Sequence, residues 1–380
     1  MKIVQKIVRK PAELAGQLAE LSAIEPSLLL AFASVDHFTA PGFIATLRSA
    51  LPHAILLGCT TAGEITAEGV DDNSCTLTAI HFDKLTLSSG SALLTNMNGS
   101  LAAGEQLGRQ LAAPDLKAVL VFGPGVQING SALLNGLTAV LGEQVPITGG
   151  LAGDGGAFNR TYTLGPDGVS DQAIVAVGLH GDHLRFGHGS FGGWEPFGPA
   201  RKVTRCVGNV LFELDGEPAL DVYKRYLGEH AQGLPASGLL FPFAMLGEHN
   251  HASGLIRTIL GVDEAAGSLT LAGEIVADGY LKLMHASTEK LVDGAEAAAQ
   301  AAADMEDAPA EQLAILVSCV GRKLVMGGRV DEEVEAVGAV FGNKAVLTGF
   351  YSYGEISPFT PGSSCLLHNQ TMTITCLSEA

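Results

Sequence analysis

The feature that most constrains this fold is a glycine motif that occurs near both ends of the chain. Residues 54–65 align without gaps with residues 345–356, so that both glycines, the Glu and the Ile of one copy match those of the other. In each copy an apolar run of strand length leads into the motif. We therefore expect an internally duplicated protein with two pseudo-equivalent halves.

The similarity extends to the flanking segments. The apolar runs 28–34 and 313–319 precede the two motifs, and the alternating strands 75–80 and 371–377 follow them. A weaker third copy covers 118–154, with Asn129 as the N-cap of a helix over 129–141, but its glycines are spaced differently. Repeating this order of strands and helices predicts an α/β (α+β mixed) fold, with mixed β-sheets flanked by helices.

Three segments are expected along the chain. Residues 1–26 are predicted as an N-terminal lead helix, 27–217 as an N-terminal domain and 218–380 as a C-terminal domain. The last boundary lies in a turn, Asp-Gly-Glu-Pro at 215–218, that precedes a predicted helix over 219–227.

Composition excludes several classes of function. Hydrophobic residues make up 47% of the chain, which supplies enough apolar material for a core, whereas a net charge of −18 disfavours nucleic acids and anionic membranes as partners. No apolar run suggests a secretory signal or a membrane span. The six cysteines form no CxxC pair, so we expect free thiols in a reducing compartment and a cytoplasmic location.

The glycine motif itself is a candidate ligand site. It follows an apolar strand, where concave sites often form, and Thr60, Thr61 and Glu64 offer hydrogen bonds beside a glycine that admits close approach. Glu355 repeats Glu64 in the second copy, so the two turns could face one pocket. The alternative is a tight turn that places Glu64 at the surface.

Four other residues are candidates for ligand contact. Tyr351 and Tyr353 could stack on a flat ligand or be half-buried sheet residues, and Trp194 is either a lid or a packing anchor in a glycine-rich loop. Arg257 could clamp an anion with its guanidinium fork or form an ordinary ion pair.

An enzyme is the alternative function. Cys59 or Glu64 together with His188 could support acyl transfer or hydrolysis, since a thiol with a nearby base is a standard arrangement. However, the residue equivalent to Cys59 in the second copy is Phe350, which favours a buried, inert cysteine. The chain also has no GxSxG, HExxH or P-loop motif and no GxGxxG with its downstream acid, so we expect no catalytic activity.

Six segments in order resemble one known family. They are 58–65, 149–154, 193–198 with 203–204, 221–227, 257–262, and 349–356 with 368–371. Over nearly the whole chain these segments resemble the FIST family, which is regarded as an intracellular sensory module. The resemblance implies a ligand-binding sensor in signal transduction, without a fused output domain and with a separate partner such as a histidine kinase. Whether the protein forms a homodimer is left open by the sequence.

The resemblance also implies two classes of ligand. Amino-acid-like molecules have been proposed for the family, and some stand-alone members are reported to bind haem and sense nitric oxide. A b-type haem requires an apolar pocket and an axial histidine. His249 and His251, beside an apolar run at 241–245, and His188 are the candidate axial ligands, although a solvated loop is the alternative for each.

Overall fold

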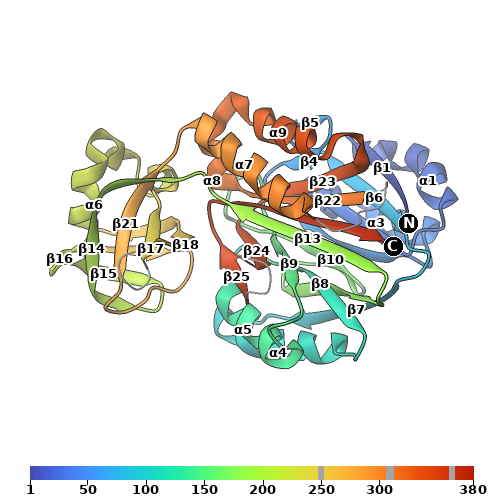
Figure 1. Cartoon of the computed structure of the whole chain (residues 1–380), viewed down its shortest axis with the longest axis horizontal. Helices are drawn as coiled ribbons and strands as arrows, with labels where there is room; N and C mark the ends of the chain where they lie inside the picture. Colours follow the sequence, from blue (N-terminus) through green and yellow to red (C-terminus); the bar gives the residue numbers. More distant parts are fainter. Residues whose placement is uncertain (247–251, 305–311, 359–363) are drawn as a thin grey trace.

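Three six-stranded sheets form the larger body of the protein, and an inserted eight-stranded sheet forms the smaller one (Figure 1). The computed structural model describes residues 1–246, 252–304, 312–358 and 364–380. None of the helices described there is long and apolar enough to cross a membrane.

The larger body consists of three units with one shared topology. Each unit has an edge strand, a long antiparallel strand and two parallel strands, in that order across the sheet. The first unit contains β1 (Lys2–Val8), β6 (Cys75–His81), β2 (Leu28–Ala33) and β3 (Ile55–Thr60). The middle unit contains β7 (Thr86–Leu93), β12 (Ala173–His180), β8 (Leu116–Gly123) and β9 (Ile147–Leu151). The third contains β13 (Leu184–Phe191), β26 (Met372–Glu379), β22 (Gln312–Cys319) and β23 (Ala345–Ser352).

The central strands are apolar throughout because both of their faces are buried. In β2, Leu28, Leu30 and Phe32 point into a core that all three sheets share, while Leu29 and Ala31 pack against helices on the outer face. A pair of helices covers each unit on that side. The pairs are α1 (Leu14–Ala23) with α3 (Phe43–Ala50), α4 (Ser100–Leu111) with α5 (Gly130–Leu141), and α7 (Thr288–Ala303) with α9 (Asp331–Phe341).

The three units exchange strands in a ring. After its glycine turn the first unit sends β4 (Glu64–Thr66) into the third unit, where it pairs with β23. The third unit sends β24 (Gly354–Pro358) to β9 of the middle unit. The middle unit sends β10 (Thr163–Gly165) back to β3. Each unit therefore completes the sheet of another, and the inner faces of all three sheets share one core.

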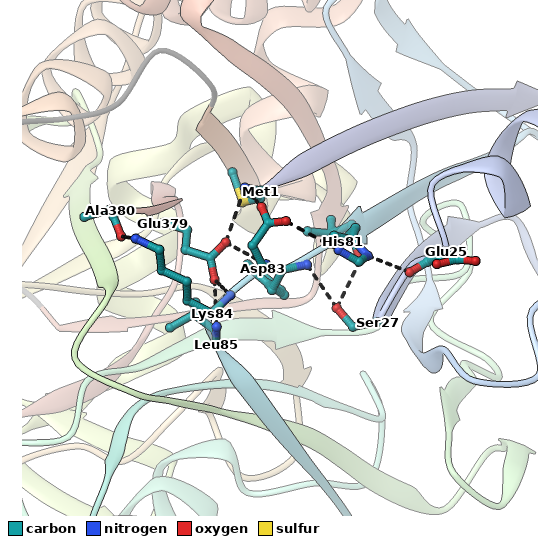
Figure 2. Close-up of polar contacts among 11 residues, drawn as sticks. Met1, Glu25, Ser27, His81, Asp83, Lys84, Leu85, Glu379 and Ala380 are labelled. Carbon is teal, nitrogen blue, oxygen red and sulfur yellow. Dashed lines mark hydrogen bonds and ion pairs between the residues drawn. The ribbon is translucent and has the colours of Figure 1, made fainter.

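The two ends of the chain lie side by side and fasten this ring (Figures 1 and 2). The Glu379 carboxylate accepts hydrogen bonds from the backbone N–H groups of Asp83, Lys84 and Leu85, at 2.8, 2.5 and 2.7 Å. Those three residues connect β6 of the first unit to β7 of the middle unit. The last strand of the third unit is thus hydrogen-bonded to the loop that connects the first unit to the middle unit.

The inserted sheet interrupts the third unit between β13 and α7. It contains β14 (Glu195–Val207), β15 (Val210–Leu214), β16 (Glu217–Pro218), β17 (Phe243–Leu246), β18 (Ala252–Arg257), β19 (Ile259–Asp263), β20 (Ser268–Leu271) and β21 (Tyr280–His285). Helix α6 (Ala219–Leu227) packs on it around a separate hydrophobic core. Glu195 pairs with His285, so the insertion begins and ends at neighbouring positions.

The mixed α/β class is confirmed, and the two ends of the chain form equivalent units as predicted. The weak third copy is a complete unit of the same kind. The predicted lead helix needs correction, because Lys2–Val8 forms edge strand β1 against β6 and only Leu14–Ala23 is α-helical. The predicted boundary at 217/218 falls inside the inserted sheet, within β16.

Candidate ligand-binding site

The three glycine turns occupy equivalent positions in the three units. Gly58, Gly149 and Gly349 each lie on the second parallel strand, and a side chain there would collide with a carbonyl oxygen of the strand beside it. The colliding carbonyls belong to residues of β2, β8 and β22. These glycines are therefore required by the close approach of the parallel strands. They do not provide a ligand surface.

Glu64 and Glu355 are held in matching cages of hydrogen bonds. Glu64 accepts from the hydroxyl of Thr61 and from the backbone N–H and hydroxyl of Ser74, the latter two at 2.9 and 2.8 Å. Glu355 accepts from the hydroxyl of Ser352 at 2.7 Å and from the N–H and hydroxyl of Thr371 at 3.2 and 3.0 Å. Each carboxyl group joins its own glycine turn to the start of the long antiparallel strand.

Both caged carboxyl groups titrate near neutral pH. Burial raises the pKa of Glu64 to about 7, against the opposing effect of its hydroxyl and N–H donors. Burial likewise raises the pKa of Glu355 to about 7. Because both side chains are buried and fully bonded within the protein, their geometry suits a structural role at the strand exchange.

The middle unit departs from this pattern. Its exchange strand has Thr163 in the register position that Glu64 and Glu355 occupy in the others. The longer loop that precedes Thr163 is organised by Asp154, whose carboxylate accepts from the N–H of Asn159 at 2.7 Å and from the hydroxyl of Tyr353. The asymmetry places Tyr353 beside a loop that the other two units lack.

A cavity of about 410 Å³ lies where the middle unit, the third unit and the inserted sheet meet. We call it the interface cavity. The loop after β8 and the first turn of α5 form one wall, and Tyr353, Leu367 and Asn369 of the third unit form another. The inserted sheet closes it with residues 208–209 and 271–274 and with Leu260. Its volume falls in the range of small-molecule sites.

Asn369 is the most informative residue in this wall. It is only 2% exposed, yet its side-chain Oδ1 is buried without a hydrogen-bond partner among the described residues. A buried polar atom without a partner is unfavourable by about 1–3 kcal/mol. Asn369 lines the interface cavity, but this Oδ1 atom is itself inaccessible, so it is not among the groups that a molecule in the cavity could reach.

The start of α5 also faces the cavity. The Asn129 side chain caps the helix by accepting from the N–H of Ala132 at 3.0 Å. The N–H groups of Gly130 and Ser131 then have no acceptor within the described part of the chain, as expected for the first residues of a helix, and of these two residues Gly130 lines the cavity. Together with the helix dipole, they make this wall electropositive.

Arg257 lies directly behind the cavity wall. It is 5% exposed and donates to the carbonyl oxygens of Leu367 and Glu274, both at 3.3 Å. Burial lowers the pKa of Arg257 to about 10, so the guanidinium is charged at neutral pH. The charge of Glu274 acts against burial and raises the pKa of Arg257.

The remaining predicted contact residues do not reach the interface cavity. Thr60, Cys59 and Tyr351 are fully buried, and burial raises the pKa of the Cys59 thiol well above its usual value. Such a thiol is a poor nucleophile, which argues against the thiol-enzyme alternative. Thr61, Glu64 and Glu355 belong to the cages described above. Of the predicted set, Tyr353 lines the cavity and Arg257 supports its wall.

Trp194 anchors the segment that leads into the inserted sheet. Its indole Nε1 donates to the carbonyl oxygen of Gln370 at 2.7 Å. The Gln370 side chain in turn donates to the carbonyl oxygen of Leu239 in the insertion at 2.9 Å. Of the two roles predicted for Trp194, the packing anchor fits this geometry.

The described residues do not fit haem at the interface cavity. No described histidine lines it, and a b-type haem requires an axial histidine. His188 lies on β13, half-buried, and burial lowers its pKa. His249 and His251, the other two candidate axial ligands, lie outside the described residues.

Sequence reasoning missed most of the cavity. Asn129 was predicted only as a helix cap, and Asn369 only as part of a family-like segment. No local pattern marks Asn98, Asn209 or Gly273, because they come together through the insertion of one sheet beside another. The one available signal was the conjunction of a helix N-cap with a glycine-rich loop after a buried strand.

The comparisons with known proteins are as follows. Two family models match the chain, one described as the FIST N domain over residues 27–217 and one as the FIST C domain over residues 219–358. The uncharacterized protein MJ1623 of Methanocaldococcus jannaschii is 35% identical over 99 residues, which represent 24% of this chain and only 18% of that protein. The crystal structure of cyanuric acid hydrolase from A. caulinodans aligns over 100% of this chain and 99% of that chain, with 10% identity and a TM-score of 0.37. That similarity is too low to indicate a shared activity.

Proposed function

This chain belongs to the FIST family of sensory, ligand-binding domains, and on that basis we propose that its ligand binds in the interface cavity. The observation that carries the proposal is the cavity of about 410 Å³ that residues of the middle unit, the third unit and the inserted sheet line together. The ligand is a small molecule with polar groups, because asparagine side chains line the space beside leucine side chains.

Ligand binding in the interface cavity would act directly on the inserted sheet, because residues of that sheet line the cavity. Asn369 lines the cavity, and the next residue, Gln370, bonds both the insertion at Leu239 and the linker at Trp194. A ligand that touches both bodies favours the arrangement in which both contacts are made. The resulting change of surface would alter affinity for a separate effector, such as a histidine kinase.

A cavity-filling substitution tests the location of the site. Ala132 lines the cavity in the first turn of α5, whereas Ala139 is exposed further along the same helix. Ala132→Trp should abolish stabilisation by a ligand, and Ala139→Trp should leave it intact. The measurement is thermal shift against a panel of amino acids and other small polar compounds. A saturating ligand at about 100 times its Kd stabilises by about 2.7 kcal/mol. Equal shifts in both variants would place the site elsewhere.

Haem is a separate prediction with its own test. The absorption spectrum of the purified protein is recorded before and after addition of hemin and then nitric oxide. A Soret band that shifts with nitric oxide would support a haem-based sensor and would direct substitutions to His188, His249 and His251. A featureless spectrum with loose hemin binding would support the small polar ligand.

A further inference from the structure

Glu355 is connected to the inserted sheet through two neighbouring residues. Its carboxyl group accepts hydrogen bonds from the backbone N–H and the hydroxyl of Thr371, at 3.2 and 3.0 Å. The preceding residue, Gln370, accepts from the indole of Trp194 through its backbone carbonyl oxygen and donates to the carbonyl oxygen of Leu239 through its side chain. Trp194 lies in the linker that enters the insertion, and Leu239 lies within the insertion. A change in the hydrogen bonds of Glu355 therefore acts on the attachment of the inserted sheet.

The insertion is attached by short linkers at one end of the larger body (Figure 1). Residues 192–194 enter it after β13, and residues 286–287 leave it before α7. Gly193 has a φ of +76°, and a Cβ there would lie 1.9 Å from the carbonyl oxygen of Lys290 in α7. The incoming linker is therefore packed directly on that helix, where only glycine fits. Short segments of this kind can absorb the rotation of a whole body at a few backbone angles.

Glu64 lies in the same kind of cage, but its surroundings differ. Its partner Ser74 follows Asn73, which occupies the position that Gln370 has in the third unit. Both of these residues have a left-handed φ, of 62° for Asn73 and 63° for Gln370. Asn73 is exposed, whereas Gln370 is fully buried beside the insertion. Of the two matched cages, that of Glu355 is thus the one bonded to the inserted sheet among the described contacts.

The titratable and charged groups around Glu355 come from the elements packed against β24. Burial raises the pKa of Glu355 to about 7, although the guanidinium of Arg322 in α8 (Val320–Met326) lowers it. Burial raises the pKa of Cys319 at the end of β22, and it lowers that of His368 in β25 (Cys365–His368) to about 4, so neither group titrates between pH 5 and 8. His188 of β13 acts on His368, and burial lowers its pKa as well. Strand β9 has no titratable side chain.

We propose that ionisation of Glu355 releases the inserted sheet, so that its attachment to the larger body is a pH-sensitive hinge. The hydrogen bonds in the cage come from neutral donors, and a buried carboxylate gains hydration when residues 370–371 move away. The protonated group gains much less, so the closed arrangement binds the proton more tightly than the open one. No ligand takes part, so the hinge is independent of the proposed function.

The sign of the pH dependence follows from this difference in proton binding. The closed arrangement has its full advantage below pH 4.5, the pKa of a hydrated glutamate, and loses that advantage as the pH rises through about 7. Between these two pKa values the ratio of open to closed protein rises by up to about 300-fold.

Trp194 reports on the hinge directly, because it is the only tryptophan of the chain and lies in the incoming linker. Its fluorescence is measured in the full chain from pH 5 to pH 8 at constant ionic strength, with and without acrylamide as a quencher. In wild type we expect emission at longer wavelength and stronger quenching as the pH rises. Glu355→Gln, which stays neutral, should keep the low-pH spectrum throughout, whereas the matched control Glu64→Gln should respond like wild type.

A second pair of variants keeps the charge of both carboxyl groups. Thr371→Val removes a hydroxyl that donates to Glu355 and keeps the shape of the side chain, so opening should begin at a lower pH. Ser74→Ala removes the corresponding donor to Glu64 and should leave the Trp194 transition where it is in wild type. This pair tests the hinge even where Glu355→Gln does not fold.

Three results would overturn the hinge. They are a wild-type Trp194 spectrum that does not change between pH 5 and 8, the same transition in Glu355→Gln as in wild type, and a transition that Glu64→Gln abolishes equally. Far-UV circular dichroism at both pH values separates hinge opening from unfolding. The hinge predicts equal spectra at pH 5 and pH 8, and a loss of secondary structure at pH 8 would contradict it.

Discussion

At the scale of single residues, two buried glutamates connect the glycine turn to the next long strand in the same way in two units. Glu64 and Glu355 each accept three hydrogen bonds from a hydroxyl before the turn and from a Ser or Thr at the start of the next long strand. The residue type that suggested ligand binding in the sequence is thus used to hold the strand exchange. A residue type that recurs at equivalent positions of one chain can therefore reflect the internal repeat of its fold.

The raised pKa of these carboxyl groups predicts a pH dependence of stability. The pKa of Glu64 and of Glu355 rises from 4.5 to about 7 on folding, so the folded state binds protons more tightly than the unfolded state. Their contribution to the free energy of unfolding therefore falls as pH rises from about 4.5 to 7, by up to roughly 3 kcal/mol per group. Glutamine mimics the protonated form and removes this dependence.

The test compares wild type with the Glu64→Gln/Glu355→Gln double variant by urea unfolding at pH 5 and pH 8. The free energy of unfolding of the variant, relative to that of wild type, should be larger at pH 8 than at pH 5. Both proteins contain His368, whose pKa burial lowers to about 4 and whose contribution to the free energy of unfolding therefore rises with pH. This contribution cancels when the two proteins are compared at the same pH. An unchanged difference between the two pH values would show that both carboxyl groups titrate normally.

A glycine at the parallel-strand position predicts a severe effect of the smallest substitution. In Gly349→Ala the new methyl group would collide with the backbone carbonyl oxygen of Leu316, which is fixed in a central strand. We expect a loss of about 3 kcal/mol or more, in the range of strongly destabilising substitutions. Gly328→Ala, where nothing lies near the added Cβ, is the control, and thermal unfolding measures both. A small effect at Gly349 would mean that β22 and β23 can move apart.

At the scale of elements, the two linkers of the inserted sheet are held at one place. The guanidinium of Arg322 is fully buried and donates to the carbonyl oxygen of Gly192 at 2.5 Å and to that of Leu291 at 2.8 Å. It also pairs with Glu333 at 2.6 Å. One side chain therefore ties the incoming linker, the outgoing helix α7 and α9 together.

Trp194→Phe should loosen the incoming linker without emptying its packing position. The substitution deletes the Nε1 hydrogen bond to Gln370 and keeps an aromatic ring. We expect a modest loss of stability, about 1 kcal/mol, and faster hydrogen exchange at residues 192–196. Phe197→Leu, at an exposed position nearby, should leave that exchange unchanged. Equal hydrogen exchange at these residues in Trp194→Phe and wild type would show that Trp194 does not anchor the linker.

At the scale of the whole molecule, the sequence predicted the repeated unit better than the way in which the units combine. Apolar strands such as 28–33 and the matching motifs at 58–65 and 349–356 are local signals, and the structure has equivalent units there. The exchange of β4, β10 and β24 between units depends on contacts between residues up to nearly 300 positions apart. No local periodicity encodes such pairings.

The same reason explains why the candidate site was found only in part. Tyr353 and Arg257 were predicted from residue type, and both lie at or behind the interface cavity. Glu64, Cys59 and Tyr351 were predicted from the glycine motif, but they are buried and do not line the interface cavity. The cavity depends on where the inserted sheet rests, which the spacing of residues in the sequence does not determine.

Excision of the inserted sheet tests the independence of the three-unit body. Residues 195–285 begin and end at paired positions, Glu195 and His285, and enclose a separate hydrophobic core. Replacing them with a short Gly/Ser linker should leave a folded body that unfolds cooperatively, with ligand-dependent stabilisation lost. Loss of folding in the shortened chain would show that the ring of units needs the insertion.

The central claim is that one ligand touches the middle unit, the third unit and the inserted sheet at the interface cavity. Hydrogen–deuterium exchange with the compound that gives the largest thermal shift tests it most directly. We predict increased protection in three segments together, 125–132, 367–371 and 271–274, in wild type and none in Ala132→Trp. Protection confined to the glycine turns at 58–65 and 349–356, or to one body alone, would contradict the account.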